Sequence, residues 1–244
     1  MNTPTSAGLQ QRVDDLQRAL RAIAADHAPA VLASSLGAED MVLADAILSG
    51  GIAVEIFTLD TGRLHAETLS VLDLVRQRYG YDIRIYRPDA GAVDHYVREF
   101  GLDAIYRTVA LRQRCCEIRK VEPLARALAG KAAWVTGLRR AQSVTRAVLP
   151  FKEFEQASGL WKFNPLADWS EREVWDYLRS RDVPYNPLHD RGFRSIGCAP
   201  CTRPTAVGED LRAGRWWWED AQTKECGLHK AAVEPVNSQT GERA

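Results

Sequence analysis

The chain has 244 residues, of which 45% are hydrophobic and 26% charged, and its 32 Lys and Arg residues are balanced by 32 Asp and Glu residues. This length and apolar content allow a large buried core, which excludes a disordered or collagen-like chain and favours a single α/β or α+β domain. The zero formal net charge argues against a general nucleic-acid binder or a membrane-surface protein, because both classes usually carry a basic excess.

The first residues contain neither a basic region nor an apolar run of the kind that directs secretion. No stretch approaches the roughly 18 apolar residues that a membrane span needs. We therefore expect a cytoplasmic protein without nucleic-acid or membrane partners. Residues 8 to 27 place apolar side chains at helical spacing, which predicts an opening amphipathic helix.

Strands and helices then alternate along the chain. Such alternation is typical of right-handed βαβ units, in which helices cover both faces of a parallel sheet. The predicted fold class is therefore α/β with a mostly parallel sheet. The expected strands are residues 28–35, 53–60, 82–88 and 132–138, and the expected helices are residues 39–50, 61–80 and about 108–129.

The second half of the chain is less regular. Residues 162–166 are a candidate edge strand. Ser170 and Glu173 have the spacing of a capping box, which predicts that a helix begins there. From Pro184 onward the chain is rich in Gly, Pro, Arg and Trp, which indicates an irregular segment over a site.

We found no linker that would divide the chain into two domains. Residues 1–229 are therefore expected to form a single domain. Residues 230–244 have the composition of a disordered tail.

The five cysteines divide into a group of four and a fifth residue. Cys115 and Cys116 are adjacent, and Cys198 and Cys201 form a C-x-x-C motif that lets two thiolates reach one metal centre. Adjacent side chains on a helix diverge by about 100°, so an extended metal cluster suits this pair better than a single tetrahedral ion. On spacing alone, zinc and an iron–sulfur cluster both stay open, as does a pair of core cysteines with a separate redox dithiol.

Cys226 stands apart, between Lys224 and His229, in a polar stretch without apolar periodicity. A lone cysteine is often a small buried hydrophobic residue. Here nearby cations favour the thiolate, which is the nucleophilic form. We therefore interpret Cys226 as a reactive thiol.

A short loop joins the first predicted strand to the following helix. Its backbone amides, the hydroxyls of Ser34 and Ser35, and the helix dipole are suited to holding a phosphate, and Gly37 and Asp40 belong to the same loop. The loop lacks both the Walker and the dinucleotide-binding glycine patterns. An ordinary strand-to-helix turn is the alternative interpretation.

A second loop, formed by Leu59, Asp60, Thr61 and Gly62, follows the second predicted strand. Parallel strands end at the same edge of a sheet, and ligands of open α/β sheets bind there. The two loops are therefore expected to meet at one crevice.

Basic residues gather in three places that are tied to the cysteines or to a strand end. A small, strongly anionic substrate held beside the metal site would explain this clustering. The three groups are Arg112, Arg114, Arg119 and Lys120; Arg139 and Arg140; and Arg203, Arg212 and Arg215.

Taken together, these motifs closely resemble the assimilatory sulfonucleotide reductases, over about residues 30 to 229. The adjacent cysteines with the C-x-x-C motif are typical of the iron–sulfur branch, the adenylyl-sulfate (APS) reductases. The branch that uses 3'-phosphoadenylyl sulfate commonly lacks these four cysteines. The motifs lie at residues 37–40, 59–64, 115–121, 136–140, 164–169, 197–204, 214–219 and 224–229.

The resemblance implies an adenine-nucleotide alpha-hydrolase-like fold and one [4Fe–4S] cluster on Cys115, Cys116, Cys198 and Cys201. It also implies that Cys226 attacks the sulfur of APS to form an S-sulfocysteine and release AMP. Thioredoxin or a similar dithiol then releases sulfite, in sulfate assimilation and cysteine biosynthesis. Because the dithiol supplies the electrons, we expect the cluster to have a structural and electrostatic role.

A thiolate that attacks an anionic sulfate meets like-charge repulsion, so fixed cations should lower the barrier. The resemblance places the phosphosulfate contacts within the Lys and Arg groups, and its nucleotide-binding loops match the two loops above. The expected substrate-binding residues are Ser34, Ser35, Gly37, Asp40, Leu59, Asp60, Thr61, Gly62, Lys120, Arg139, Arg140, Arg212 and Arg215.

Three alternatives stay open. The enzyme could reduce 3'-phosphoadenylyl sulfate, or both sulfonucleotides. An adenylating ATP pyrophosphatase of the same fold is a rival enzyme class, but its S-G-G-x-D-S motif does not match the loop after the first strand. A zinc-binding interaction module without catalysis is a rival of a different class. The sequence does not determine the oligomeric state, and a homo-oligomer is compatible with it.

Overall fold

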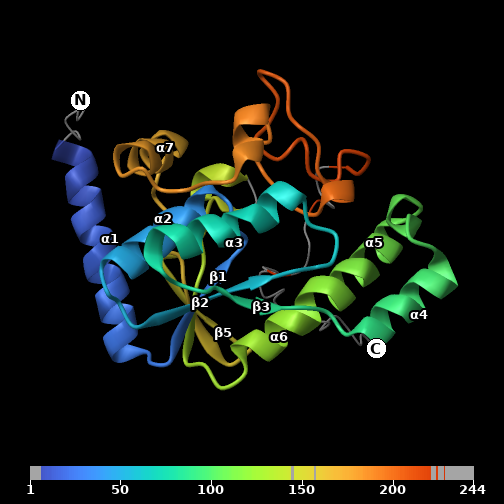
Figure 1. Cartoon of the computed structure of the whole chain (residues 1–244), viewed down its shortest axis with the longest axis horizontal. Coiled ribbons are helices and arrows are strands. Elements are labelled where there is room, and N and C mark those ends of the chain that lie inside the picture. The colour runs from blue at the N-terminus through green and yellow to red at the C-terminus, as the bar shows by residue number, and fades with distance from the viewer. Residues whose placement is uncertain (1–6, 144–145, 157, 221–223, 225–227, 229–244) are drawn as a thin grey trace, which may run out of the picture.

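The computed structural model describes residues 7–143, 146–156, 158–220, 224 and 228. At its centre is a six-stranded sheet with the strand order β3-β2-β1-β4-β6-β5 (Figure 1). Neighbouring strands are parallel, except that β5 pairs antiparallel with β6. The strands are β1 (Ala30–Ser34), β2 (Val54–Leu59), β3 (Arg84–Tyr86), β4 (Ala133–Val135), β5 (Lys152–Glu155) and β6 (Leu160–Phe163).

Helices cover both faces of this sheet (Figure 1). One face packs against α1 (Ala7–Asp26), α2 (Ala38–Ser49), α3 (Ala66–Tyr79) and α7 (Glu171–Ser180). The other face packs against α6 (Glu122–Leu128). The chain reaches α6 through α4 (Ala90–Phe100), α5 (Val109–Cys116) and a π-helical turn at Glu117–Val121.

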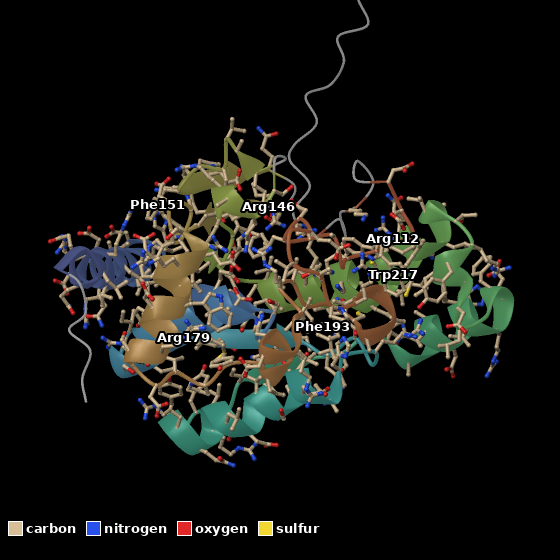
Figure 2. The ribbon with its side chains drawn as sticks, turned by 90° about the horizontal axis from the view of Figure 1, so that it is seen from above. Arg112, Arg146, Phe151, Arg179, Phe193 and Trp217 are labelled. Carbon is tan, nitrogen blue, oxygen red and sulfur yellow. The ribbon has the colours of Figure 1, made fainter. Side chains whose placement is uncertain are left out.

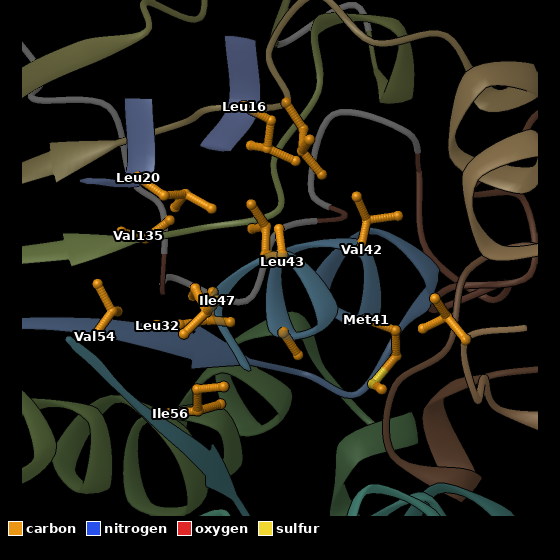
Figure 3. Packing of buried hydrophobic residues seen from close by; sticks show 14 of the residues in the cluster. Leu16, Leu20, Leu32, Met41, Val42, Leu43, Ile47, Val54, Ile56 and Val135 are labelled. Atoms are coloured by element: carbon orange, nitrogen blue, oxygen red, sulfur yellow. The ribbon is translucent and has the colours of Figure 1, made fainter. Parts of the chain in front are cut away.

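The alternation of side chains along each strand divides the core between the two faces. On β1, Leu32 packs with residues of α1 and α2, as Figure 3 shows, whereas Val31 packs with Leu124 of α6. Helix α2 is apolar and buried on nearly every side because it lies between the sheet, α1 and α7. The predicted α/β class, with helices on both faces of a mostly parallel sheet, is confirmed.

The helix predicted at residues 61–80 begins later, at Ala66. The residues before it form side-chain-capped turns: the Gly62 amide donates to Asp60 Oδ1 at 3.0 Å, and the Arg63 amide donates to Thr61 Oγ1 at 3.2 Å. Gly62 adopts φ +69, which a helix cannot contain. Short polar side chains here compete with the helical hydrogen bonds, so the helical prediction for these residues was wrong.

The prediction of an edge strand at residues 162–166 was also wrong. Strand β6 lies between β4 and β5, and the edge is β5, which the sequence did not predict. Helix α4 was missed as well. By contrast, the capping box that opens α7 is confirmed, because Ser170 Oγ accepts from the Glu173 amide and Glu173 Oε2 accepts from the Ser170 amide.

The segment from residue 184 to 220 contains only short 3-10 turns, at Pro187–Arg191 and Ala199–Cys201, as its composition predicted. In Figure 1 it is the orange to red chain beside the carboxyl ends of the central strands. None of the described helices is long and apolar enough to cross a membrane. That residues 1–229 form one domain stays a prediction, and residues 230–244 lie outside the described residues.

Candidate active site

The strand order changes direction between β1 and β4, and this point defines the site. From β1 the chain winds outward to β2 and β3, then returns across the other face of the sheet to β4. Open α/β sheets bind ligands in the crevice at the carboxyl ends of such strands. A cavity of about 210 Å³ lies there, and its wall includes Ser34 after β1 and Gly137 after β4.

The end of β1, the loop after it and the first turn of α2 contribute to the cavity wall the residues that the sequence placed at this crevice, namely Ser34, Ser35, Gly37 and Asp40. The Asp40 carboxylate accepts hydrogen bonds from the Ser35 amide and the Ser35 hydroxyl, both at 2.6 Å. A Cβ on Gly137 would lie 2.3 Å from Asp40 Oδ1, so only glycine fits at that position. Burial raises the pKa of Asp40 to about 6.

Part of this loop is hydrogen-bonded within the protein, and its expected role in phosphate binding stays a prediction. The Ser35 donors are already used by Asp40, and the Ser34 hydroxyl accepts from the Leu36 amide at 3.1 Å. A carboxylate beside these donors also repels an anion. The donors of Ser35 and the Leu36 amide are therefore engaged, whereas the first turn of α2 has no side-chain cap.

The loop after β2 connects the cavity to the cysteines. Leu59 and Thr61 are part of the cavity wall, whereas Asp60 forms an ion pair with Arg87 at 3.1 Å. The Thr61 carbonyl accepts from Arg119 Nη1 at 2.7 Å, and Thr61 Oγ1 lies 3.2 Å from Cys198 Sγ. Gly62 helps to turn the loop and is not part of the described cavity wall.

Three of the predicted cations, Lys120, Arg212 and Arg215, line the cavity. They come from the π-helical turn before α6 and from the irregular segment, which are far apart in sequence. Together they give this side of the cavity a positive charge. An anionic group of a ligand is therefore expected on this side.

Arg139 and Arg140 do not belong to the described cavity wall. The buried Arg139 guanidinium donates to Glu39 Oε1 at 2.8 and 2.9 Å and to the Trp169 carbonyl at 3.2 Å. Arg140 pairs with Asp168 and donates to the Leu149 carbonyl. Their direct contact with substrate is not supported, because both guanidinium groups have protein partners on other elements.

The cavity also contains residues that the sequence did not predict as site residues. Gln142 and Arg146 follow β4, and a search for residues after that strand could have found them. Arg194 and His189 come from the irregular segment, which has no periodic signal. Figure 2 labels Arg146, which follows β4, and Phe193 of the irregular segment.

His189 is the most informative of these missed residues. Its Nε2 atom is buried and has no hydrogen-bond partner among the described residues. Burial lowers the pKa of His189, so the ring is neutral near pH 7. A ligand with a hydroxyl or amino group can supply the missing hydrogen bond.

The four cysteines of the predicted metal site all line a second, smaller cavity. Cys115 and Cys116 end α5, where the helix changes to a π-helical turn, whereas Cys198 precedes a 3-10 turn and Cys201 is the last residue of that turn. All four are buried and none forms a disulfide. Burial raises the pKa of Cys201 to about 12, so charged thiolates here need a compensating positive group.

These residues fit an extended metal cluster. Within the described part of the chain, no three His, Cys, Asp or Glu side chains have the spacing that one metal ion requires, yet all four thiols line one cavity. Arg112, Arg119 and Lys120 line the same cavity and supply positive charge. This positive charge would compensate the charge of buried thiolates that hold a metal centre.

Cys226 lies outside the described residues. The nearest described residues on either side of it, Lys224 and Leu228, lie at the cavity of about 210 Å³. Leu228 lines the cavity, and the Lys224 carbonyl accepts from Arg212 Nη2 at 3.1 Å.

Two curated proteins are similar to most of this chain. Adenosine 5'-phosphosulfate reductase of Burkholderia cepacia is 57% identical over 98% of this chain and 95% of its own length. The protein of the same name from Allochromatium vinosum is 59% identical over 84% of this chain and 80% of its own length.

Solved structures support the same fold. Phosphoadenylyl-sulfate (PAPS) reductase from Candida auris, solved as a phosphate complex, is 26% identical, with a TM-score of 0.67 over 82% of this chain and 98% of its own. FMN adenylyltransferase from Candida glabrata, solved with ATP, is 15% identical with a TM-score of 0.58 over 90% of this chain and 75% of its own, and shares the fold alone. Residues 29–204 match the phosphoadenosine phosphosulfate reductase domain. With its sheet, its cationic cavity and its four buried cysteines, the chain belongs to the phosphoadenosine phosphosulfate reductase domain family.

Proposed function

We propose that this protein reduces adenylyl sulfate to sulfite and AMP with electrons from thioredoxin or a similar dithiol, in sulfate assimilation and cysteine biosynthesis. The observation that carries the proposal is one cavity at the β1/β4 switch point with Lys120, Arg212 and Arg215 on its wall, beside four buried cysteines. The high identity to two adenosine 5'-phosphosulfate reductases supports the substrate.

The two sides of the cavity suggest how the substrate lies. Phe57, Leu59 and Trp134 offer apolar surface, so this side suits the adenosine. Lys120 and Arg215 suit the phosphosulfate. Asp60, Gly62, Arg139 and Arg140, which were expected to touch substrate, take supporting roles in this arrangement.

In the proposed reaction the Cys226 thiolate attacks the sulfur of adenylyl sulfate. An S–S bond forms, the bond from sulfur to the phosphate oxygen breaks, and AMP leaves with that electron pair. One thiol of the reductant then attacks Cys226 Sγ and expels sulfite, and its second thiol closes a disulfide and restores Cys226. The dithiol thus supplies both electrons, and the cations stabilise the charge that develops on the leaving phosphate.

Cys115, Cys116, Cys198 and Cys201 would hold one [4Fe–4S] cluster. When bound, such a cluster crosslinks α5 to the irregular segment and adds a fixed charge beside the cavity. Lys120 lines both cavities, so its ammonium group can interact electrostatically with both the cluster and the substrate. This supports a structural and electrostatic role for the cluster.

The cellular setting and assembly are part of the same proposal. We place the enzyme in the cytoplasm, where thioredoxin is kept reduced. A homo-oligomer is compatible with the proposal.

The decisive experiment supplies adenylyl sulfate and reduced thioredoxin to the cluster-loaded protein and measures sulfite and AMP. We expect the wild type to form sulfite and AMP in equal amounts. Cys226→Ser should form neither product over multiple turnovers. Absence of sulfite from the loaded wild type would overturn the proposal.

3'-Phosphoadenylyl sulfate is a second candidate substrate, because the related Candida auris enzyme is named for it. A parallel assay with this compound, at matched concentrations, separates the two. The zinc-module alternative predicts a colourless protein with stoichiometric zinc, whereas an iron–sulfur protein is brown with broad visible absorption.

A further inference from the structure

Two arginine side chains contact the ring of Trp216. The Arg112 guanidinium carbon is 4.7 Å from the centroid of the Trp216 ring, and the Arg215 guanidinium carbon is 4.6 Å from it. The tryptophan is 1% exposed. Cation–π contacts are strongest when they are removed from water, so both contacts are favourable here.

The backbone holds this ring in an unusual conformation. Trp216 has φ +43, in the left-handed region that bulky residues rarely adopt. Its amide donates to the Cys201 carbonyl at 3.1 Å. The position of the ring is therefore set by the C-x-x-C segment, whose cysteines line the smaller cavity.

Arg215 is confined on its other sides as well. A Cβ on Gly197 would lie 2.6 Å from the Arg215 guanidinium carbon, so the glycine leaves the space that the guanidinium uses. Arg215 Nη1 donates to the Ile196 carbonyl at 3.1 Å. Its Nε atom is buried without a hydrogen-bond partner among the described residues. The Nε donor of this cavity-lining arginine is therefore unsatisfied among the described residues.

Arg112, the other arginine at the ring, lies in the wall of the cysteine cavity. It is 0% exposed and forms two hydrogen bonds of 2.8 Å to the Glu219 carboxylate. It also hydrogen-bonds to Cys116. Arg112, Trp216 and Arg215 therefore form one chain of contacts from the cysteine cavity to the larger cavity.

We propose that Trp216 is a positioning residue that holds Arg215 against the anionic end of the substrate and couples the state of the cysteine cavity to anion affinity. The inference rests on the proposed function, because it assigns the phosphosulfate to the Arg215 side of the cavity. A change in the charge or position of Cys116 moves the Arg112 side chain. Because Arg112 and Arg215 contact the same Trp216 ring, this movement changes the position of Arg215. By reciprocity, anion binding changes the environment of the cysteine site by the same factor.

The test measures dissociation constants for adenylyl sulfate and for adenosine, which lacks the anion, by calorimetry on the cluster-loaded protein. We expect Trp216→Leu to weaken adenylyl sulfate binding by about tenfold, the size of a desolvated cation–π contact, and adenosine binding by less than about twofold. Trp216→Phe keeps an aromatic face and should restore most of the affinity. Trp217→Leu is the matched control, because its side chain is 41% exposed, and it should leave both constants unchanged.

A double-mutant cycle shows whether Trp216 acts through Arg215. In an Arg215→Met background, Trp216→Leu should cause no further loss of adenylyl sulfate affinity. The visible spectrum of the wild type should also shift on adding adenylyl sulfate but not in Trp216→Leu. Additive losses in the cycle, or equal losses for both ligands with no rescue by phenylalanine, would overturn the inference. If the wild type binds adenylyl sulfate no better than adenosine, the proposed function fails instead.

Discussion

At the scale of one residue, Asp40 hydrogen-bonds the loop after β1, but its burial disfavours the charged carboxylate. It is buried between Ser35 and Gly137 and keeps its hydrogen bonds, yet burial raises its pKa from 3.8 to about 6. The folded protein therefore holds this proton more tightly than the unfolded chain. Its carboxylate organises the loop after β1 at a cost in stability at neutral pH.

This cost predicts a pH-dependent effect of Asp40→Asn. For the wild type, the contribution of Asp40 to the free energy of unfolding falls as pH rises from 3.8 to about 6, by up to about 3 kcal/mol. The amide does not titrate, so the variant should gain stability relative to the wild type over this range. Urea unfolding at several pH values between 4 and 7 measures the difference, and a difference independent of pH would contradict the assignment.

The second residue-scale prediction concerns His189. His189 lines a cavity that a nucleotide is proposed to fill, and its Nε2 has no partner among the described residues, so His189→Leu removes a group that could hydrogen-bond a hydroxyl or amino group of the ligand. We expect AMP binding to weaken about fivefold to tenfold, the value of one hydrogen bond.

His65→Leu is the control for this variant. The Nε2 of His65 is also buried without a partner among the described residues, but His65 is not part of the described cavity wall. Calorimetric titration with AMP should show no change for this variant. Equal losses for both variants would mean that His189 acts only through folding.

At the scale of elements, one buried carboxylate joins three helices. Asp45 of α2 accepts from Tyr79 of α3 at 2.9 Å and from Tyr177 of α7 at 2.7 Å, and Arg181 also donates to it at 3.2 Å. Burial, followed by the charge of Asp45, raises the pKa of Tyr177 far above its usual value, so this hydroxyl keeps its proton. The network fixes α3 and α7 relative to α2, whose first turn forms the cavity wall.

Tyr177→Phe should therefore lower the free energy of unfolding by about 1.5–3 kcal/mol, because a hydrogen bond to a buried charged group is lost. Tyr185→Phe is the control: its hydroxyl bonds the exposed Asp190, and its loss should cost less than about 0.5 kcal/mol. Chemical denaturation of both variants checks this. Similar small effects would show that Asp45 does not need the Tyr177 hydroxyl.

At the scale of the whole molecule, the cysteine site connects elements that are far apart in the chain. Cys115 and Cys116 belong to α5, whereas Cys198 and Cys201 belong to the irregular segment that lines the substrate cavity. A cluster held by all four would crosslink them. Loss of one ligand should therefore affect the cavity as well as the metal site.

We expect Cys198→Ser to lose the brown colour and the iron, whereas Cys226→Ser keeps both, because only the first substitution removes a proposed ligand. Visible absorption and iron analysis of the purified variants measure this. Retention of a full cluster in Cys198→Ser, or its loss in Cys226→Ser, would reverse the assignment of the two kinds of cysteine.

The sequence by itself determined the α/β class, most of the helices and strands, and the grouping of four cysteines apart from Cys226. These features depend on local periodicity, capping and spacing, which neighbouring residues encode. The late start of α3 was missed because turns capped by Asp60 and Thr61 replaced helical hydrogen bonds. The edge position of β5 was missed because strand order depends on distant pairing.

Only the tertiary structure decided which cations face the substrate cavity. Arg139 and Arg215 were predicted as substrate-binding residues on the same kind of sequence pattern. In the structure Arg139 donates to Glu39, one hundred positions away in the chain. Arg215 contacts Trp216 and is part of the cavity wall. A guanidinium group sits on a long side chain, so its target depends on which distant partner lies within reach. Local sequence does not contain that information, and the packing of the folded chain supplies it.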